Sequence, residues 1–252
     1  MKTLWTWLML MLLPTQSAVF LGTNYAPPAT SCTLGYTTNL QLDLEAGNIT
    51  SCTGAAVTTW PGTTLTTISA NPVNGPTCMA SGGSNGGPYV QTNGTSQYFN
   101  LSATAGAGNA GTIFAVVAPT NVAVFGTLLD YAGTSGSLTL YTGATGNTYG
   151  SNKSYSAGLG HGNTALVNNA WHQINSSYDG TTDYYRIDST ADGSYAYTAT
   201  AFANWATVFA DQNHTAGFWG GKAEAILAYN AALTTANKQL VESYLRCKYG
   251  VL

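Results

Sequence analysis

The sequence predicts an all-β domain, a sandwich or a barrel, that ends in a single amphipathic helix. Roughly a dozen short runs rich in β-branched and aromatic residues follow one another, and Gly, Asn, Asp or Pro separates them. Helix-length segments do not alternate with these runs, so the pattern disfavours βαβ units. Only residues 221–250 differ, because there one strand-like run is followed by apolar residues at helical spacing.

The first 18 residues are typical of a secretory signal peptide. A basic start at Lys2 precedes an apolar run over 4–13, then Pro14 and small residues up to Ala18. The apolar run has about 10 residues, whereas a membrane-spanning helix needs about 20. We therefore expect cleavage after Ala18 and a secreted or cell-surface protein. The alternatives are an uncleaved anchor and a buried N-terminal strand.

The rest of the chain shows no internal repeat and no interdomain linker. We predict an extended segment over 19–37 and one domain over 38–250. Within that domain, residues 46–95 are dominated by Gly, Thr, Asn and Pro, which favour turns. Only 57–60 and 63–69 are candidate short strands in this stretch.

The domain opens with the run TNLQLDLEA, in which three leucines alternate with Gln41, Asp43 and Glu45. Such alternation predicts a half-buried strand with one apolar and one polar face. Asp43 and Glu45 stand two residues apart and therefore share a face. We interpret that face as solvated.

Further strand-like runs follow between residues 96 and 230. The run GTIFAVVAP (111–119) is almost wholly apolar, which predicts a strand buried on both faces. The runs 123–133 and 136–143 lie close enough to form a hairpin. A turn is predicted at Ala191-Asp192-Gly193, between two of the later strands. The other predicted strands cover 96–102, 170–180, 182–189, 194–202 and 222–230.

The closing helix is predicted to start after Thr234, a favourable N-cap residue. Apolar residues over 236–247 recur at helical spacing and form a stripe that must dock on the sheets. Glu242 and Arg246 stand four residues apart in the favourable order. Gly250 can end the helix in a left-handed turn. We interpret the helix as a stabilising clasp whose charged residues face solvent.

Four cysteines occur without CxxC spacing, which disfavours a zinc site or a thioredoxin-type pair. In an exported protein an even number predicts disulfides, although four free thiols are the alternative. Three connectivities exist. We favour Cys52–Cys78, which closes a Gly/Pro-rich loop, and Cys32–Cys247, which ties the start of the domain to its last helix.

Charge excludes one class of partner. Only 7% of residues are charged, the net charge is −3, and the lysines and arginines are scattered. Nucleic acid is therefore not an expected partner, because phosphate binding needs clustered cations. The 16 tyrosines, with many Asn and Thr, suit neutral hydroxyl-rich ligands, and they suit many extracellular β proteins equally well.

Several segments together resemble the concanavalin A-like lectin/glucanase superfamily, in its laminin-G-like branch. They are NLQLDLEAGNIT…VTTWPG, GGPYVQTNGTSQYFNLS, GTIFAVVAP, NAWHQINSSYDGTTDYYRIDSTADGS and GFWGGKAEAILAYNAALTTANKQLVESYLRCKYG. The resemblance implies a two-sheet antiparallel jelly-roll sandwich with a short docked C-terminal helix. One departure is Asn237, which stands where the family's capping box has Glu.

The fold implied by the resemblance hosts enzymes, lectins and structural modules, so the residues must decide between them. The glucanase relatives carry an E-x-D-x-E-like pattern, but the glutamates of this chain (Glu45, Glu224 and Glu242) do not form it. The G-x-S-x-G match at 82–86 stands in a glycine-rich turn and not between a strand and a helix, so it forms no nucleophile elbow. The three histidines stand in undiagnostic settings. We therefore predict a non-catalytic protein and keep a polysaccharide hydrolase or lyase as a second alternative.

Carbohydrate binding in this fold needs an exposed aromatic ring for stacking and polar groups for hydroxyls. Trp205, in the segment FANWATVF, is our best stacking candidate because it stands in an apparent loop. Tyr149, Tyr155 and His161 are the next candidates, since long loops such as 143–163 often carry function. We therefore predict an exported domain that binds carbohydrate or another surface ligand.

The remaining tryptophans of the domain, Trp60, Trp171 and Trp219, are predicted to be packed. No cofactor is predicted, although the resemblance leaves calcium open, since many relatives hold Ca²⁺ at the sandwich rim. The chain lacks a D-x-D-x-D-G loop. The main alternative function is a structural or adhesive module of a cell surface or virion that acts through protein–protein contacts.

Overall fold

The structure is a computed structural model that describes residues 31–106, 108–131, 138–143, 148–152, 160–196 and 204–251. The chain divides into two compact units, 1–31 and 32–252, and the fold described below is that of the second. The predicted signal peptide and most of the predicted extended segment lie outside the described residues. Residues 32–37 form no regular secondary structure.

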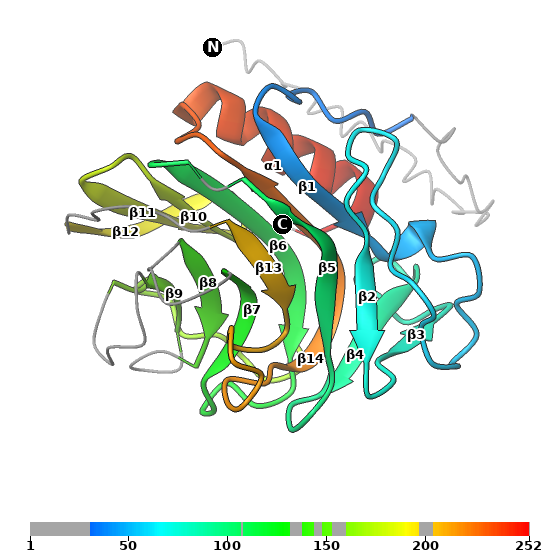
Figure 1. The fold of residues 1–252 in the computed structure, drawn as a ribbon. Helices are drawn as coiled ribbons and strands as arrows, with labels where there is room; N and C mark the ends of the chain where they lie inside the picture. Colours follow the sequence, from blue (N-terminus) through cyan, green and yellow to red (C-terminus); the bar gives the residue numbers. More distant parts are fainter. Residues whose placement is uncertain are drawn as a thin grey trace, which may run out of the picture. The chain divides into compact units, whose positions relative to one another are not determined.

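Two antiparallel sheets pack face to face, and the helix α1 (Thr235–Tyr249) covers the outer face of the larger one (Figure 1). This confirms the predicted all-β sandwich with a short C-terminal helix docked on it. The larger sheet has the order β12-β11-β10-β6-β14-β4-β3, and β1 also pairs with β14. Its strands are β1 (Leu40–Glu45), β3 (Thr77–Met79), β4 (Tyr89–Asn93), β6 (Gly111–Pro119), β10 (His172–Tyr178), β11 (Thr182–Ile187), β12 (Thr190–Ala196) and β14 (Gly220–Tyr229).

The smaller sheet has the order β2-β5-β13-β7-β8-β9. Its strands are β2 (Ala70–Val73), β5 (Tyr98–Ala105), β7 (Gly126–Tyr131), β8 (Thr139–Thr142), β9 (Tyr149–Asn152) and β13 (Trp205–Val208). The predicted hairpin over 123–143 is confirmed, because β7 and β8 pair antiparallel. A short 3-10 helix, η1 (Ala46–Asn48), follows β1.

Strand β6 is buried along its whole length, as its apolar run predicts. Alternate side chains point to opposite faces of a strand, so β6 contributes to two cores. Ile113, Ala115 and Val117 pack between the two sheets. Phe114 and Val116 face the other way and pack under α1. If β6 alternated polar and apolar residues, one of these two cores would lack the apolar side chains that β6 supplies.

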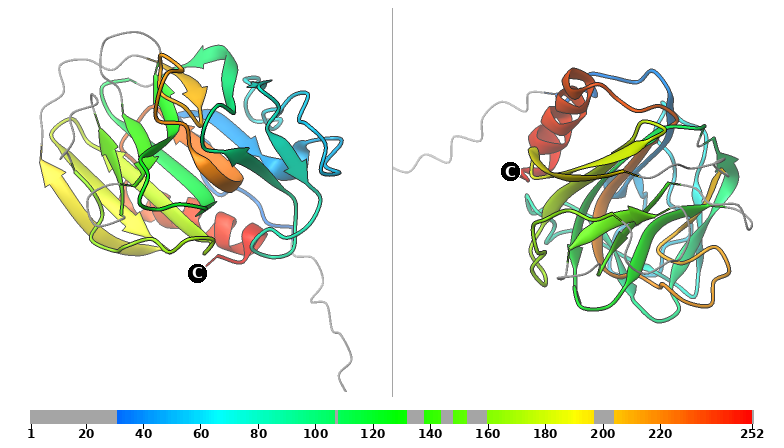
Figure 2. Two further views of the ribbon diagram at one scale, coloured as in Figure 1. Left: turned by 90° about the horizontal axis from the view of Figure 1, so that it is seen from below. Right: turned by 90° about the vertical axis from the view of Figure 1, so that its left-hand side faces the viewer.

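Helix α1 lies along the larger sheet (Figure 2). Its buried residues Val241, Leu245 and Tyr249 belong to the core under the helix. The predicted helix ends are both confirmed. The Thr234 hydroxyl accepts a hydrogen bond from the Asn237 amide, and Gly250 adopts a left-handed φ of 68°. No helix among the described residues is long and apolar enough to span a membrane.

Both predicted disulfides are confirmed. Cys32 pairs with Cys247 across a sequence separation of 215, and Cys52 pairs with Cys78 across 26. The first bond joins the segment before β1 to the last turns of α1. The second closes the Gly/Pro-rich region before β3. Their Cα–Cα distances, 5.7 and 4.7 Å, lie within the range that disulfides span.

The prediction for the surface of α1 was partly wrong. Leu240, within the predicted apolar stripe, is 46% exposed, whereas Lys238 and Glu242 are buried. Glu242 pairs with Arg186 of β11 and not with Arg246. Arg246 instead donates to the Ser189 hydroxyl at 2.7 Å. The reason is that β11 brings a second arginine to the helix, which local spacing does not reveal.

Two strand predictions also need correction. The ranges 57–60 and 63–69 are not strands. Trp60 forms only an isolated β-bridge with Ala70, and 63–69 contains a turn and irregular backbone. The turn between β11 and β12 lies at Asp188–Ser189, whose φ values are 48° and 66°. The predicted turn at 191–193 is instead part of β12. Asp188 tolerates this backbone because its carboxylate accepts from the Gln173 amide at 2.9 Å.

Candidate functional site

A cavity of about 680 Å³ lies where β1, the segment 61–65 and the C-terminal half of α1 meet. This volume is within the roughly 300–1,000 Å³ typical of small-molecule sites. Polar and apolar groups contribute about equally to its lining. The lining residues are Cys32, Thr33, Leu34, Asp43, Glu45, Asn48, Thr50, Pro61, Gly62, Thr63, Thr64, Leu65, Tyr244 and Lys248.

The polar face of β1 forms the floor of this cavity. Leu42 and Leu44 point into the core between the sheets, so Asp43 and Glu45 point to the face that α1 covers. Both carboxylates are buried, which contradicts our interpretation of a solvated strand face. The alternation was read correctly, but the helix that covers the polar face comes from the far end of the chain.

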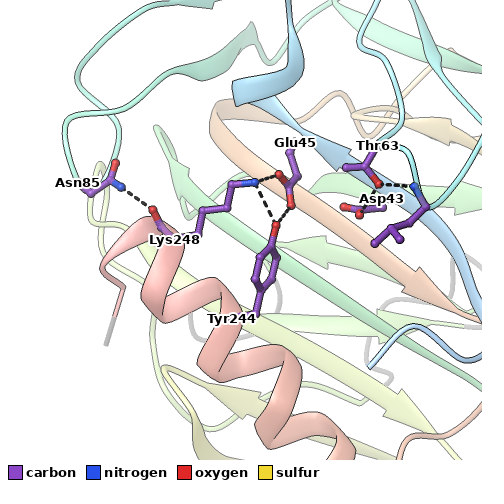
Figure 3. A network of polar contacts seen from close by, with 7 residues as sticks. Asp43, Glu45, Thr63, Asn85, Tyr244 and Lys248 are labelled. Atoms are coloured by element: carbon purple, nitrogen blue, oxygen red, sulfur yellow. Dashed lines mark hydrogen bonds and ion pairs between the residues drawn. The ribbon is translucent and has the colours of Figure 1, made fainter. Parts of the chain in front are cut away.

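Glu45 is held by two side chains of α1. Its Oε1 accepts a hydrogen bond from the Tyr244 hydroxyl, and its Oε2 forms an ion pair with the Lys248 ammonium (Figure 3). The Lys248 Nζ also lies 3.0 Å from the Tyr244 hydroxyl. Burial, followed by its contact with Glu45, raises the pKa of Tyr244, so its hydroxyl stays protonated and donates. Glu45 thus has a partner on each oxygen.

Asp43 is less completely satisfied. Its Oδ2 accepts from the Thr63 hydroxyl at 2.7 Å (Figure 3), whereas its buried Oδ1 has no hydrogen-bond partner. Burial, and secondarily the charge of Glu45, raises the pKa of Asp43 to about 7. Buried polar atoms are seldom left unpaired, because the unmade bond costs free energy. Asp43 Oδ1 is therefore an unpaired acceptor beneath the floor of the cavity, and a ligand donor that reached it would be stabilised.

The loop before β4 fixes the last turn of α1, which carries Lys248. The Ser84 amide donates to Glu224 Oε1 at 2.9 Å, and the Ser84 hydroxyl donates to the Tyr249 carbonyl at 2.5 Å. Asn85 donates to the Lys248 carbonyl, also at 2.5 Å (Figure 3). Gly83 is required here, because a Cβ would lie 2.0 Å from Glu224 Oε1.

The cavity offers hydrogen-bonding groups of both kinds. Acceptors come from Asp43, donors come from Lys248, and the threonine hydroxyls can do both. Among the described residues, no cluster of three or more His, Cys, Asp or Glu could hold a metal ion. The arrangement suits a small neutral molecule with several hydroxyl groups.

The structure places the predicted stacking residue Trp205 elsewhere. Trp205 lies on β13, not in a loop, and its ring is fully buried in the core between the sheets. Its Nε1 donates to the Leu138 carbonyl at 2.7 Å. The prediction of an exposed ring was therefore wrong, because a central strand of the smaller sheet carries it. Trp60 and Trp219 are buried as predicted, and Trp171 is half-buried.

The other predicted ligand residues lie around β9. Tyr149 is fully buried, so it presents no surface for stacking, and its ring packs edge-on against Tyr185 at 6.2 Å. His161 is half-buried, and its backbone forms an isolated antiparallel β-bridge with Gly150. Its Nδ1 lies 2.7 Å from the Gly162 carbonyl oxygen. Tyr155 lies outside the described residues. None of the described three lines the cavity at β1.

The sequence did contain signals for the residues that line this cavity. Asp43 and Glu45 share a strand face, and Tyr244 and Lys248 stand four apart on the helix. What local pattern did not reveal is that these two pairs meet. The contact spans about 200 residues, since Tyr244 and Glu45 are separated by 199 positions.

No family model matches the sequence, and no curated protein matches it. Solved structures with a similar fold include a mutant of Trypanosoma rangeli sialidase displaying trans-sialidase activity, with a TM-score of 0.58 and 11% identity over 85% of this chain and 34% of that one. Trypanosoma rangeli sialidase in complex with sialic acid gives a TM-score of 0.57 and 11% identity, covering 84% and 34%.

Domain 4 of AbnA, a GH43 extracellular arabinanase from Geobacillus stearothermophilus, is also similar, with a TM-score of 0.47 and 15% identity over 82% of this chain and 98% of that domain. The chain spans about one third of the length of the sialidases it matches. At these identities the sialidase likeness shows the fold alone. It agrees with the two-sheet sandwich described above, and membership of the concanavalin A-like superfamily stays a prediction.

Proposed function

We propose that this domain binds carbohydrate without catalysing a reaction, and that the cavity floored by Asp43 and Glu45 is its binding site. The observation that carries the proposal is the buried, unpartnered Asp43 Oδ1 at the floor of a cavity of about 680 Å³. A sugar hydroxyl that donates to this oxygen would replace the hydrogen bond that burial removes. Hydroxyls of Thr63 and Thr64 surround the same space.

The partners of Glu45 favour binding over catalysis. A nucleophile or general base needs a carboxylate oxygen that reaches the substrate. Both Glu45 oxygens are already engaged, by Tyr244 and by Lys248. Glu45 therefore supports the cavity, while Asp43 is left to contact the ligand.

One observation favours a glycoside hydrolase as a second candidate. Asp43, with its pKa raised to about 7, stands two residues from a carboxylate that is paired with lysine. Carboxyls whose environments separate their pKa values often act as acid and base. Release of reducing ends from a bound polysaccharide, lost in Asp43→Asn, would establish this candidate and overturn the non-catalytic proposal.

Export is part of the proposal. The N-terminal signal-peptide pattern and the two disulfides support it, because disulfides persist in oxidising compartments. Carbohydrate polymers and glycans are abundant outside cells, so the location and the ligand class agree. A structural or adhesive module is the alternative that follows if no sugar binds.

The test is binding of the disulfide-bonded protein to a panel of neutral glycans and insoluble polysaccharides, with calcium and with chelator. We expect saturable binding to one sugar class that weakens at least about tenfold in Asp43→Asn. Asn48→Ala, at the exposed rim, should weaken the same binding by a smaller factor.

Asp183→Asn is the matched control. Asp183 is also buried, has one hydroxyl partner (Ser176, 2.7 Å) and one unpartnered oxygen, and its pKa is raised to about 7, mainly by burial. It does not line the cavity. Equal loss in both variants would assign the effect to folding and overturn the site. No binding from the folded wild-type protein would favour the structural module, and sizing of its oligomers would follow.

A further inference from the structure

A second, smaller cavity lies on the other side of α1, at its N-terminal end. It has a volume of about 320 Å³ and is lined by Ser177, Asp179, Tyr184, Ala232, Leu233, Thr234, Thr235 and Lys238. Strands β10 and β11 supply one wall, and the first turn of α1 supplies the other. The volume is at the lower end of the range for ligand pockets and suits one monosaccharide unit.

Lys238 is the group in this cavity that points to a ligand. Its side chain belongs to a residue only 8% exposed, and within the described part of the chain its ammonium has neither a hydrogen-bond acceptor nor an ion-pair partner. Its Nζ lies 5.6 Å from the centroid of the Tyr184 ring. It also lies in the field of Glu242 and Asp183, which favour its charged form without bonding to it. Because no acceptor among the described residues contacts the ammonium directly, an anion that enters the cavity can form a charge-assisted hydrogen bond with it.

Asp183 and Glu242 lie close enough to favour the charged form of Lys238, but neither forms an ion pair with it. Glu242 is held by Arg186, with Nε–Oε1 at 2.6 Å and Nη2–Oε2 at 3.0 Å. Burial raises the pKa of Asp183 to about 7, so it carries only part of a charge at neutral pH. Asp179 uses its Oδ1 within its own turn, where it accepts from the Thr181 and Thr182 amides at 2.9 and 2.8 Å.

The rest of the cavity matches a sugar ring. Tyr184 is 41% exposed, so part of its ring is accessible to a sugar. Thr234 and Thr235 present hydroxyls, and the first turn of a helix leaves backbone N–H groups without intrahelical acceptors. The macrodipole adds a favourable interaction with negative charge at the same end.

From this geometry we propose that the cavity between β10, β11 and the first turn of α1 is a second binding site, for a carboxylate-bearing monosaccharide unit. The carboxylate contacts Lys238, the sugar ring stacks on Tyr184, and the ring hydroxyls contact Thr234 and Asp179. The choice of a saccharide over another carboxylate rests on the proposed carbohydrate-binding function. The anion site itself rests on Lys238 alone.

The experiment is titration of the full, disulfide-bonded protein with D-galacturonate, its uncharged methyl ester, and acetate, followed by calorimetry and by NMR of the tyrosine rings. We expect galacturonate to bind at least about tenfold more tightly than either other probe. Lys238→Met should weaken galacturonate binding by at least about tenfold. Tyr184→Ser, at an exposed position, should weaken it by a smaller factor.

Lys222→Met is the matched control, because Lys222 also lies over a tyrosine ring (Tyr89, 5.3 Å) but lines neither cavity. It should leave galacturonate binding unchanged. If Lys238→Met fails to fold, Tyr184→Ser together with the ester comparison still decides the matter. Equal binding of galacturonate and its ester, or of galacturonate and acetate, overturns the acidic-sugar site.

Asp43→Asn separates this inference from the proposed function. It should weaken neutral-glycan binding at the first cavity at least about tenfold and leave galacturonate binding unchanged. Galacturonate binding that depends on Lys238 supports the second site even where no neutral glycan binds. Neutral-glycan binding without any galacturonate binding overturns the second site and leaves the first.

Discussion

The middle and the C-terminal end of helix α1 are each anchored to the larger sheet by an ion pair with a buried glutamate, and the two pairs differ in their cations. Glu242 is 1% exposed and lies against the planar fork of Arg186, which is itself 13% exposed, with Asn175 donating to the same oxygen at 3.2 Å. Glu45 is equally buried, but its cation is Lys248, which is 34% exposed at the mouth of a cavity. Both ion pairs join α1 to a strand of the larger sheet.

The difference shows how a buried ion pair can be either closed or open. The guanidinium of Arg186 meets both Glu242 oxygens at once, which satisfies the pair and fixes the helix against β11. Lysine is a point charge, so Lys248 satisfies one oxygen of Glu45 and leaves Asp43 beside it without a partner on Oδ1. We interpret the closed pair, Glu242–Arg186, as a structural contact and the open pair, Glu45–Lys248, as part of the proposed binding site.

The largest predicted effect on stability is at the closed pair, Glu242–Arg186. Glu242→Gln leaves Arg186 as a buried cation without its anion, and we expect a loss of about 3–5 kcal/mol in the free energy of unfolding. Urea unfolding followed by circular dichroism measures this. A double replacement of Arg186 and Glu242 by methionine should recover most of the loss. A loss below that of Glu45→Gln would contradict the comparison.

Glu45→Gln should cost less, about 1–3 kcal/mol, because the side chain of Lys248 is about one third exposed and can be solvated when its partner is lost. The same change removes a neighbouring negative charge, so the pKa of Asp43 should fall below about 7. Carboxyl ¹³C chemical shifts across a pH titration report that pKa. An unchanged value would show that burial alone sets it.

The stability of the protein should also depend on pH through Asp43, which lies beside the open pair. The folded-state pKa of Asp43 is about 7, above its ordinary value of 3.8, so its stabilising contribution is complete below about pH 4 and is lost as the pH rises through 7. The pKa values of Asp183 and Glu224, both raised to about 7 mainly by burial, act in the same direction. We expect the Tm to fall between pH 5 and pH 8.

Asp43→Asn tests the share of that slope which belongs to the cavity. The variant has no carboxyl to deprotonate, so its Tm should fall less over the same pH interval. Asp183→Asn should flatten the slope in the same way and yet retain sugar binding. A wild-type Tm that rises from pH 5 to pH 8 would refute the assignment of sign.

The smallest effect is expected at Arg246. It was the predicted partner of Glu242, but its recorded bond is to the exposed hydroxyl of Ser189. Arg246→Ala should therefore change the free energy of unfolding by less than about 1 kcal/mol. A thermal melt beside an Arg186→Ala variant makes the contrast direct, since the latter removes the partner of Glu242.

Much of the fold could be predicted from the sequence, because its signals are local. The apolar run of β6 implied burial on both faces, and Thr234 and Gly250 marked both ends of α1. The sequence allowed three disulfide connectivities, and the favoured one, Cys52–Cys78 with Cys32–Cys247, is the one that forms. Alternation, capping and turn residues act over a few positions, so a single sequence records them.

The candidate sites depended on tertiary structure. Trp205 stood in a segment with loop-like composition, yet pairing with β5 and β7 makes it a core residue. The alternation predicted that Asp43 and Glu45 form a solvated strand face, but α1 covers both side chains. Lys238 looked like one more surface charge of the helix, and packing against β11 buried it.

Sequence alone therefore predicted the all-β class, the long buried strand and the ends of the closing helix, and it favoured the cysteine pairing that the structure shows. Tertiary structure decided which polar side chains lie in water and which line a cavity. The physical reason is that solvation depends on what packs above a side chain. Here the covering element, α1, is separated from β1 by almost the entire domain.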